Sequence, residues 1–325
     1  MRKQIICVLV TFMLLVTYDT IVAQSENVSK LEENMQQMNY EFNPEISYTQ
    51  LADLVFHVLA YMKVNNASNL YDEAYIERMT IEKTGFEYDM IPHIERLQEY
   101  YNQNFERLAI VNFMPFYVGS IQDLRNRLSN FQNISSEDKE LFIDPFLDIL
   151  ESESSFYFDY WNRFHRDNAE YRLNVENRLK AELQKFSCIY KYHNVQPFMV
   201  LSYSITRNGR GFNRGGYFSG AIPFPKNDND FNYTLIMTLH EHTHSFTNPL
   251  LNGNISMDDD SFDLSENLVI LADYYLIKAV DETLMPDYLK VFGLLSEEDL
   301  LKHFVINDNL HNLLMKKIDD ILSVR

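Results

Sequence analysis

Cysteine is almost absent from this sequence, and its scarcity limits how the chain can be stabilised. Only Cys7 and Cys188 occur, and Cys7 lies in an apolar segment close to the N-terminus. If that segment is removed, Cys188 remains alone and cannot form an internal disulfide. We therefore expect a protein held together by its hydrophobic core, for which an apolar content of 46% is ordinary.

Positive charge is also scarce, since 28 lysines and arginines stand against 47 acidic residues, for a net charge of −19. A chain this acidic is not expected to bind nucleic acid or an anionic membrane surface, because both repel it. The sequence contains no internal repeat, low-complexity tract or clear linker. One large domain, or two closely packed ones, fits a mature length of about 300 residues.

The N-terminus has no apolar run long enough for a membrane-spanning helix, which needs roughly 20 residues. It has a short basic start at residues 1–4, an apolar run at residues 5–16, and the small residue Ala23 before Gln24. This order is typical of a secretory signal peptide that is cleaved between Ala23 and Gln24. We expect an exported protein, periplasmic or extracellular, that keeps no stable membrane anchor.

The rest of the chain is predicted to be mainly helical. Residues 24–44 are polar and unpatterned, and we interpret them as a flexible leader. Residues 45–186 show apolar side chains at helical spacing, including one long helix from Phe156 to about Phe186. Residues 187–325 contain two β-like runs, 197–205 and 217–224, followed by further helices. The predicted fold class is α+β, with a helical N-terminal region that packs on a core with a small sheet.

Glycine is rare as well, and its few copies are concentrated. Five of the nine glycines fall between Gly209 and Gly220, in the segment that joins the two β-like runs and in the first half of the second run. This pattern favours a hairpin with a long, mobile loop, and therefore an antiparallel sheet. The helix predicted after the second run is expected to end at Asn248-Pro249.

That helix contains LHEHTHSF, residues 239–246, with three of the nine histidines. His240 and His244 are four residues apart, so on a helix both rings leave the same face and can bind one Zn²⁺. Glu241 lies beside these ligands, where a base for a zinc-bound water is needed. His242 points about 200° away from His240 and is not expected to reach the same ion. The alternative is a set of solvent-facing histidines without a metal.

A catalytic zinc site needs a third protein ligand. Thr247 and Leu250 stand where the metzincin class has Gly and His, so that class is excluded. Glu266 lies on a helix that looks buried on two faces, and a buried carboxylate needs a positive partner such as zinc. The alternatives are a salt bridge from Glu266 to a buried Arg or Lys, and Asp263, the expected N-cap of this helix, as the ligand. Asp273, on the same face as Glu266, is the candidate to hold the distal N–H of a zinc histidine.

The pattern His240-Glu241-x-x-His244 followed by Glu266 resembles the gluzincin branch of the zinc metallopeptidases. The wider chain resembles a group of uncharacterised exported Bacteroidetes proteins placed among peptidases of that branch. The similarity lies in ISYTQLADLVFHVLAYM, in the aromatic WNRF helix and in HEHTHSFTNP. It implies a zincin-like catalytic core with one Zn²⁺ per chain and a peptide or protein substrate. The pattern departs from well-known gluzincins at Ile270, where they carry an Asp or a similar residue.

The same resemblance implies that the strand before the motif helix binds the substrate backbone by strand addition. Residues 216–224, or their partner 200–205, would take this role, and the glycine segment would be a lid or a cleft wall. Three arginines of that segment are candidates to meet a substrate carboxylate, unless the segment is a solvated hairpin tip: Arg207, Arg210 and Arg214.

The predicted function is a secreted zinc metallopeptidase in which Glu241 takes a proton from the zinc-bound water and passes it to the leaving amine. A further donor is needed for the oxyanion. The candidates are Tyr and His residues that follow the motif helix: Tyr274, Tyr275, Tyr288, His303 and His311. Two alternatives are a non-catalytic binding protein on a zincin scaffold and a helical scaffold or adhesin without metal. The presence of Glu241 argues against the non-catalytic binding protein, since a structural metal site needs no base.

Overall fold

A computed structural model describes residues 40–64, 73–83, 94–251 and 261–325. The predicted signal peptide and residues 24–39 of the predicted leader lie outside these ranges. The described end of the leader is docked on the protein: the Tyr40 hydroxyl donates to the Val195 carbonyl at 2.7 Å, and the Gln196 amide donates to the Glu41 carbonyl at 2.8 Å. Across the described ranges, no helix has the length and apolar character required to cross a membrane.

Four strands form a mixed sheet in the order β1-β2-β4-β3. Strands β1 (Glu45–Ser47) and β4 (Tyr217–Pro223) both pair in parallel with β2 (Gln196–Ser202). Strand β3 (Arg210–Gly211) forms an edge of the sheet and pairs antiparallel with β4. The sheet thus draws its first strand from the region that the sequence assigned to helices.

The predicted antiparallel hairpin is wrong, because β2 and β4 run parallel and the glycine segment between them supplies the edge strand β3. The burial of the strands explains the difference. All residues of β2 and β4 after the first are buried, so both faces of these strands are covered. Nearly continuous apolar runs of this kind are typical of parallel strands packed on both sides, whereas a half-exposed hairpin would alternate.

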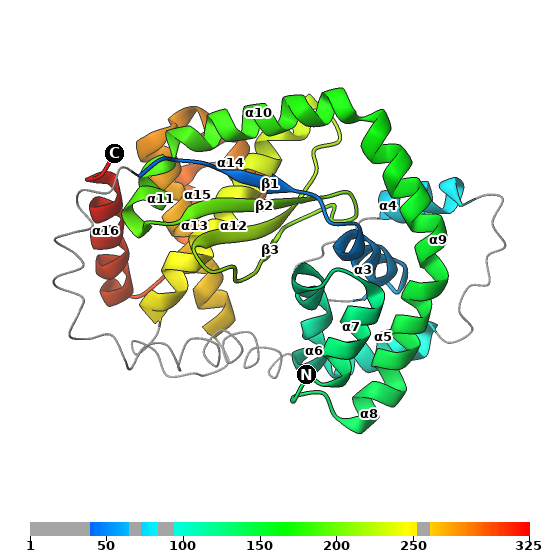
Figure 1. The fold of residues 1–325 in the computed structure, drawn as a ribbon. Helices are drawn as coiled ribbons and strands as arrows, with labels where there is room; N and C mark the ends of the chain where they lie inside the picture. Colours follow the sequence, from blue (N-terminus) through cyan, green and yellow to red (C-terminus); the bar gives the residue numbers. More distant parts are fainter. Residues whose placement is uncertain (1–39, 65–72, 84–93, 252–260) are drawn as a thin grey trace.

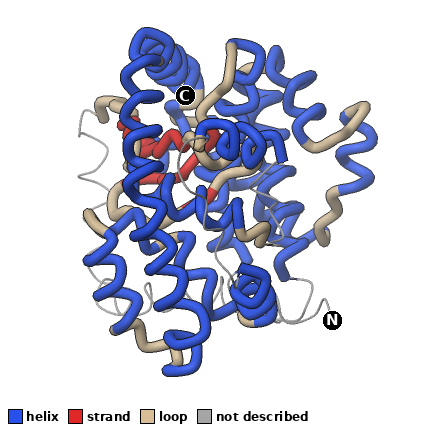
Figure 2. Tube along the Cα trace, turned by 90° about the vertical axis from the view of Figure 1, so that its right-hand side faces the viewer, coloured by secondary structure: helices blue, strands red, loops and turns tan. Residues whose placement is uncertain are grey.

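Helices of the C-terminal region cover the sheet (Figures 1 and 2). The motif helix α12 (Phe231–Leu251) packs against β4 and against α13 (Ser261–Val280), and α10 (Ala169–Lys185) also contacts α12. The remaining elements of this region are short or terminal: α11 (Ser187–His193), η4 (Asp228–Asp230), η5 (Glu282–Leu284), α14 (Met285–Val291), α15 (Glu297–His303) and α16 (Asp308–Leu322).

The N-terminal helices are grouped around α3 (Gln50–Tyr61), which packs on α9 (Asp144–Asp167). Every residue of α3 from Leu51 to Ala60 is buried, as expected of a helix that is apolar on nearly all sides. The other elements of this group are α4 (Glu73–Glu82), α5 (Ile94–Gln103), α6 (Phe105–Leu108), η1 (Ala109–Asn112), η2 (Met114–Tyr117), α7 (Ile121–Ser129), α8 (Ser136–Asp138) and the π-helical turn η3 (Lys139–Ile143).

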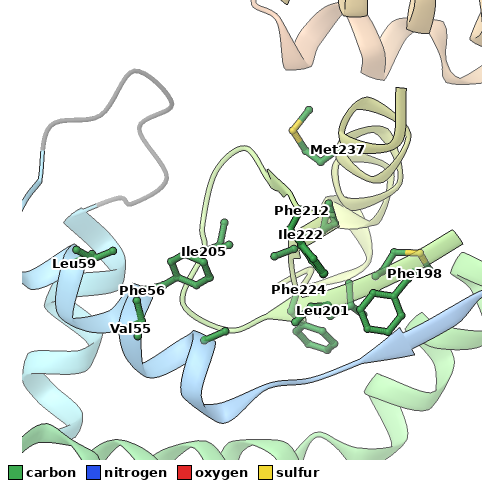
Figure 3. Close-up of a cluster of buried hydrophobic side chains, with 14 of the residues drawn as sticks. Val55, Phe56, Leu59, Phe198, Leu201, Ile205, Phe212, Ile222, Phe224 and Met237 are labelled. Carbon is green, nitrogen blue, oxygen red and sulfur yellow. The ribbon is translucent and has the colours of Figure 1, made fainter. Parts of the chain in front are cut away.

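One apolar core joins the N-terminal helices to the sheet. Figure 3 shows side chains of α3, among them Phe56, beside Ile205 and close to those of β2, β4 and α12. A buried polar contact supports the same junction, because Asp53 of α3 accepts hydrogen bonds from the Trp161 indole at 2.8 Å and from the Ser202 hydroxyl at the end of β2. The two regions therefore pack as one unit.

Two predicted helix boundaries are wrong. The long helix expected after Phe156 is broken at Asn168, between α9 and α10. The side-chain amide of Asn168 donates to the Phe164 carbonyl at 2.9 Å, beside the backbone bond to the same carbonyl at 3.1 Å. The motif helix continues past Pro249 to Leu251. A proline has no N–H, so the carbonyl four residues before it loses its helical hydrogen bond. Here that carbonyl belongs to Ser245, which is exposed and can be solvated by water.

Candidate metal centre

The packing of α12 on α13 brings three side chains to one point. His240 and His244 leave the same face of α12, and Glu266 faces them from the first half of α13. The Nε2 atom of His240 lies 3.5 Å from one oxygen of Glu266, and the Nε2 atom of His244 lies 3.6 Å from the other. One ligand atom from each of the three residues lies within 4.8 Å of the other two, so the group can hold a metal ion.

The spacing of this group fits zinc. With bonds of about 2.0–2.2 Å and tetrahedral angles, two atoms that bind the same Zn²⁺ lie about 3.4 Å apart. The separations of 3.5 and 3.6 Å, which the two histidines make with different oxygens of Glu266, are close to this value, and all three ligand atoms stay within 4.8 Å of one another. Two imidazoles and one carboxylate are also a usual donor set for catalytic zinc, and this set leaves a fourth position for water or substrate.

Asp273 lies behind His240. Its Oδ2 atom is 2.9 Å from His240 Nδ1, and only 2% of the residue is exposed. If Nδ1 carries the proton and donates it to this carboxylate, Nε2 of His240 keeps its lone pair directed at Glu266 and free for a metal. The orienting carboxylate thus stands two helical turns after Glu266, and not at Ile270, one turn after it, where well-known gluzincins have theirs.

The site carries opposite charges in a buried setting. Burial lowers the pKa of His240, but Asp273 and Glu266 outweigh burial and raise it well above its ordinary value. Burial raises the pKa of Glu266, but His244, His240 and Arg210 bring it down to about 2. Without a metal the group is therefore a carboxylate facing a protonated histidine, and uptake of a divalent cation has to displace that proton.

Glu241 is packed against the sheet. Gly209, Gly211 and Gly220 surround its side chain: an added Cβ would lie 2.5 Å from Glu241 Cγ at Gly209, 3.2 Å from Oε2 at Gly211, and 2.9 Å from Cβ at Gly220. Glu241 is only 8% exposed. The concentration of glycines predicted as a mobile loop thus has a packing role, because residues without side chains let β3 and β4 lie directly against the base.

We expect Gly209→Ala to lower peptide turnover by about tenfold to a hundredfold, because a displacement of about 1 Å at a reacting group has effects of this size. The new methyl would overlap Cγ, Oε1 and Cδ of Glu241, which has to move. Bound zinc should stay at the wild-type level, since none of the three ligands is touched. Gly215→Ala is the matched control, because a Cβ there meets no atom within 4 Å. Equal turnover in the two variants would show that Glu241 is not held by this contact.

His242 and Asp263 lie apart from the group, as the sequence predicted for His242. The His242 ring is buried on the sheet side, with Nδ1 2.9 Å from the Tyr190 hydroxyl and Nε2 3.4 Å from the Phe198 carbonyl. Burial lowers its pKa to about 4, so it is neutral at physiological pH. Asp263 is exposed in the first turn of α13 and is not its N-cap, because the helix begins at Ser261.

The candidate oxyanion donors mostly have other partners. The Tyr274 hydroxyl donates to Glu297 at 2.6 Å, and the Tyr275 hydroxyl lies 3.1 Å from His311 Nε2. The Tyr288 hydroxyl donates to the Ile270 carbonyl at 2.6 Å. His303 lines a surface hollow beside Gly293 and Lys302. Among the described residues, none of these five side chains bonds to the three-residue group or to Glu241.

The strands proposed to add a substrate strand are not free to do so. Strands β2 and β4 are internal and are paired on both sides. The edge beside the motif helix is β3, which the sequence did not identify as a strand because it is two residues long. Its continuation is fixed to the N-terminal helices: Phe212 stacks on Phe116 with ring centres 4.3 Å apart, and the Tyr117 hydroxyl donates to the Asn213 carbonyl at 2.6 Å.

The site thus combines a His–His–Glu group, a carboxylate that orients one histidine, and a second carboxylate packed under a glycine-lined edge strand. The chain matches no protein-family model, no curated protein and no solved structure.

Proposed function

We propose that this chain is a zinc-dependent peptidase of the gluzincin type. The observation that supports this most strongly is the position of Glu241. It follows directly on His240, is only 8% exposed, and is enclosed by Gly209, Gly211 and Gly220. A carboxylate enclosed in this way next to a potential metal ligand is typical of a general base, whose position has to be fixed relative to the water it activates.

Each residue of the site has a defined part in the proposed reaction. His240, His244 and Glu266 would hold the ion, and Asp273 would keep His240 in the tautomer that offers Nε2. A bound zinc ion supplies a Lewis acid for the scissile carbonyl and lowers the pKa of a water towards about 7. Glu241 takes the proton of the attacking water and then passes it to the amine that leaves.

We propose that this activity lies outside the cytoplasm, as the N-terminal sequence predicts. The basic start, the apolar run and Ala23 predict an exported protein cleaved before Gln24, as proposed above. The proposed substrate is a peptide or protein of that compartment.

The test is zinc content together with hydrolysis. Protein purified after expression with ample zinc should carry about one zinc per chain by elemental analysis. A chelator should remove the metal and abolish hydrolysis of a mixed peptide pool, and added zinc should restore both. Metal-free wild-type protein from a zinc-replete culture would contradict the proposal, and so would hydrolysis that persists after complete metal removal.

A further inference from the structure

Edge strand β3 places one charged side chain beside the base. Gly209 and Gly211 both face Glu241. Successive side chains of a strand alternate between its two faces, so Arg210 leaves the face opposite to α12. Phe212 lies two residues later on the same face and stacks on Phe116, so this face is directed towards the N-terminal helices. Arg210 thus leaves the strand between the two glycines that contact Glu241 and points towards the N-terminal helices.

Arg210 is half-buried and lacks a partner of its own. Its Nε atom is buried and has no hydrogen-bond partner, and within the described ranges no carboxylate forms an ion pair with it. Its neighbour Arg214 is held by Glu45 at 3.7 Å and by the face of the Phe198 ring at 3.8 Å. Arg207 is exposed to solvent. In a chain with 47 acidic and 28 basic residues, an unpaired arginine beside an active site is unusual and suggests that its partner comes from outside.

The charge of Arg210 acts on the metal group as well. It is one of the groups that bring the pKa of Glu266 down to about 2. With the ion bound, its two charges are balanced by Glu266 and Glu241, and Asp273 leaves the site with an excess negative charge. Arg210 compensates that charge and adds a forked donor that matches the geometry of a carboxylate.

The length of the free edge of β3 limits how many residues of a substrate can pair with it. The strand is two residues long, and immediately after it Phe212 and Asn213 are covered by Phe116 and Tyr117. An extended peptide that pairs with this edge therefore has space for about one or two residues before it meets the N-terminal helices, at about 3.4 Å per residue. This arrangement suits the end of a chain better than its middle.

We propose that Arg210 binds the C-terminal carboxylate of the substrate, so that the site acts on peptides close to their C-terminus. The inference rests on the proposed peptidase function. Arg210 would contact the substrate directly and set its specificity, while the base and the metal group carry out hydrolysis. A carboxylate from an acidic side chain of the substrate has the same chemistry, so the experiment has to separate the two sources.

Three pools of acetylated tetrapeptides make the separation. The first pool has free C-terminal acids without Asp or Glu, the second has the corresponding amides, and the third has amides with one internal Glu. Each cut releases one new amine, which gives kcat/KM. We expect the acid pool to be preferred over the plain amides by about tenfold to a hundredfold, the usual effect of a charged hydrogen bond. Equal rates on acids and plain amides, or a preference for the internal Glu pool, would overturn the proposal.

Variants then assign the preference to one side chain. Arg210→Gln should lower kcat/KM on the acid pool more than on the plain amides, so that the preference for acids is lost. Arg207→Gln removes the same charge from an exposed position of the same segment and should keep the preference. If Arg207→Gln loses it and Arg210→Gln does not, the assignment is wrong. The acid–amide comparison on wild-type protein remains decisive if Arg210→Gln does not fold.

A binding measurement separates this proposal from the proposed function. Equilibrium dialysis of the zinc-loaded Glu241→Gln protein against the pools, followed by mass spectrometry, reports retention without turnover. Preferential retention of the acids that depends on Arg210 would support the carboxylate site even if the wild type cleaves none of the pools, a result that would contradict peptidase action. Cleavage without any preference in retention or rate would contradict the carboxylate site alone.

Discussion

Replacement of Glu241 by Gln is expected to lower peptide turnover by about two to four orders of magnitude, the usual contribution of a positioned acid–base group. Gln has the same shape, so it can occupy the space under Gly209 and Gly211 without disturbing β3. The metal should be retained, since Glu241 is outside the group formed by His240, His244 and Glu266. Turnover and zinc content have to be measured on the same preparation.

The zinc content of the Glu241→Gln variant distinguishes loss of the base from a general disturbance of the structure. A variant that loses zinc together with activity would point to a structural disturbance, and its circular dichroism and unfolding temperature would then differ from wild type. A variant that keeps zinc and still turns over substrate at the wild-type rate would rule out the assigned mechanism. The binding-protein alternative predicts unchanged peptide retention in this variant and no hydrolysis in the wild type.

Replacement of Glu266 by Gln is expected to lower the affinity for zinc as well as the rate of peptide hydrolysis. Loss of an outer partner of a ligand typically lowers metal affinity by about tenfold to a hundredfold, and loss of an anionic ligand should exceed about a hundredfold. His240 and His244 would then face a neutral amide, so the ion would be held by two neutral nitrogens. Competition with a zinc indicator measures the change, and turnover should be recovered in part by excess zinc.

Asp263→Asn is the matched control for this ligand assignment. Asp263 lies on the same helix as Glu266, but it is exposed in the first turn and the structure does not group it with the histidines. Its replacement should leave zinc affinity within about twofold of wild type, because surface charge changes have small effects. If Asp263→Asn loses zinc and Glu266→Gln keeps it, the third ligand has been assigned to the wrong residue.

Much of the candidate site could be predicted from local spacing. A regular helix fixes the relation of His240, Glu241 and His244, so five residues of sequence determine which side chains share a face. The approach of Glu266 to the two histidines followed from a weaker argument, namely that a carboxylate on a buried helix face needs a positive partner. Both arguments depend only on helix geometry and burial, which the sequence pattern carries.

The surroundings of Glu241 could not be predicted in the same way. The glycines were visible, but their contact with the base depends on which strand lies at the edge of the sheet. The order of the strands in the sheet depends on whether neighbouring strands run parallel or antiparallel. An apolar run in the sequence identifies a strand but does not give its direction relative to its neighbours. The role of Arg210 was open for the same reason, since three arginines of one segment look alike until β3 and the ion pair of Arg214 with Glu45 distinguish them.

The parallel pairing of β1 with β2 has a consequence for how the protein folds. Tyr40 and Val195, which bond beside this pair, are 155 residues apart in sequence. Contacts between such distant segments form slowly, because a long loop has to close before they contribute. During synthesis the first strand emerges well before its partner and has to wait unpaired. We therefore expect β2, β3 and β4, which follow one another in the sequence and carry the glycines around Glu241, to pair first, and the sheet to be completed last by the docking of β1.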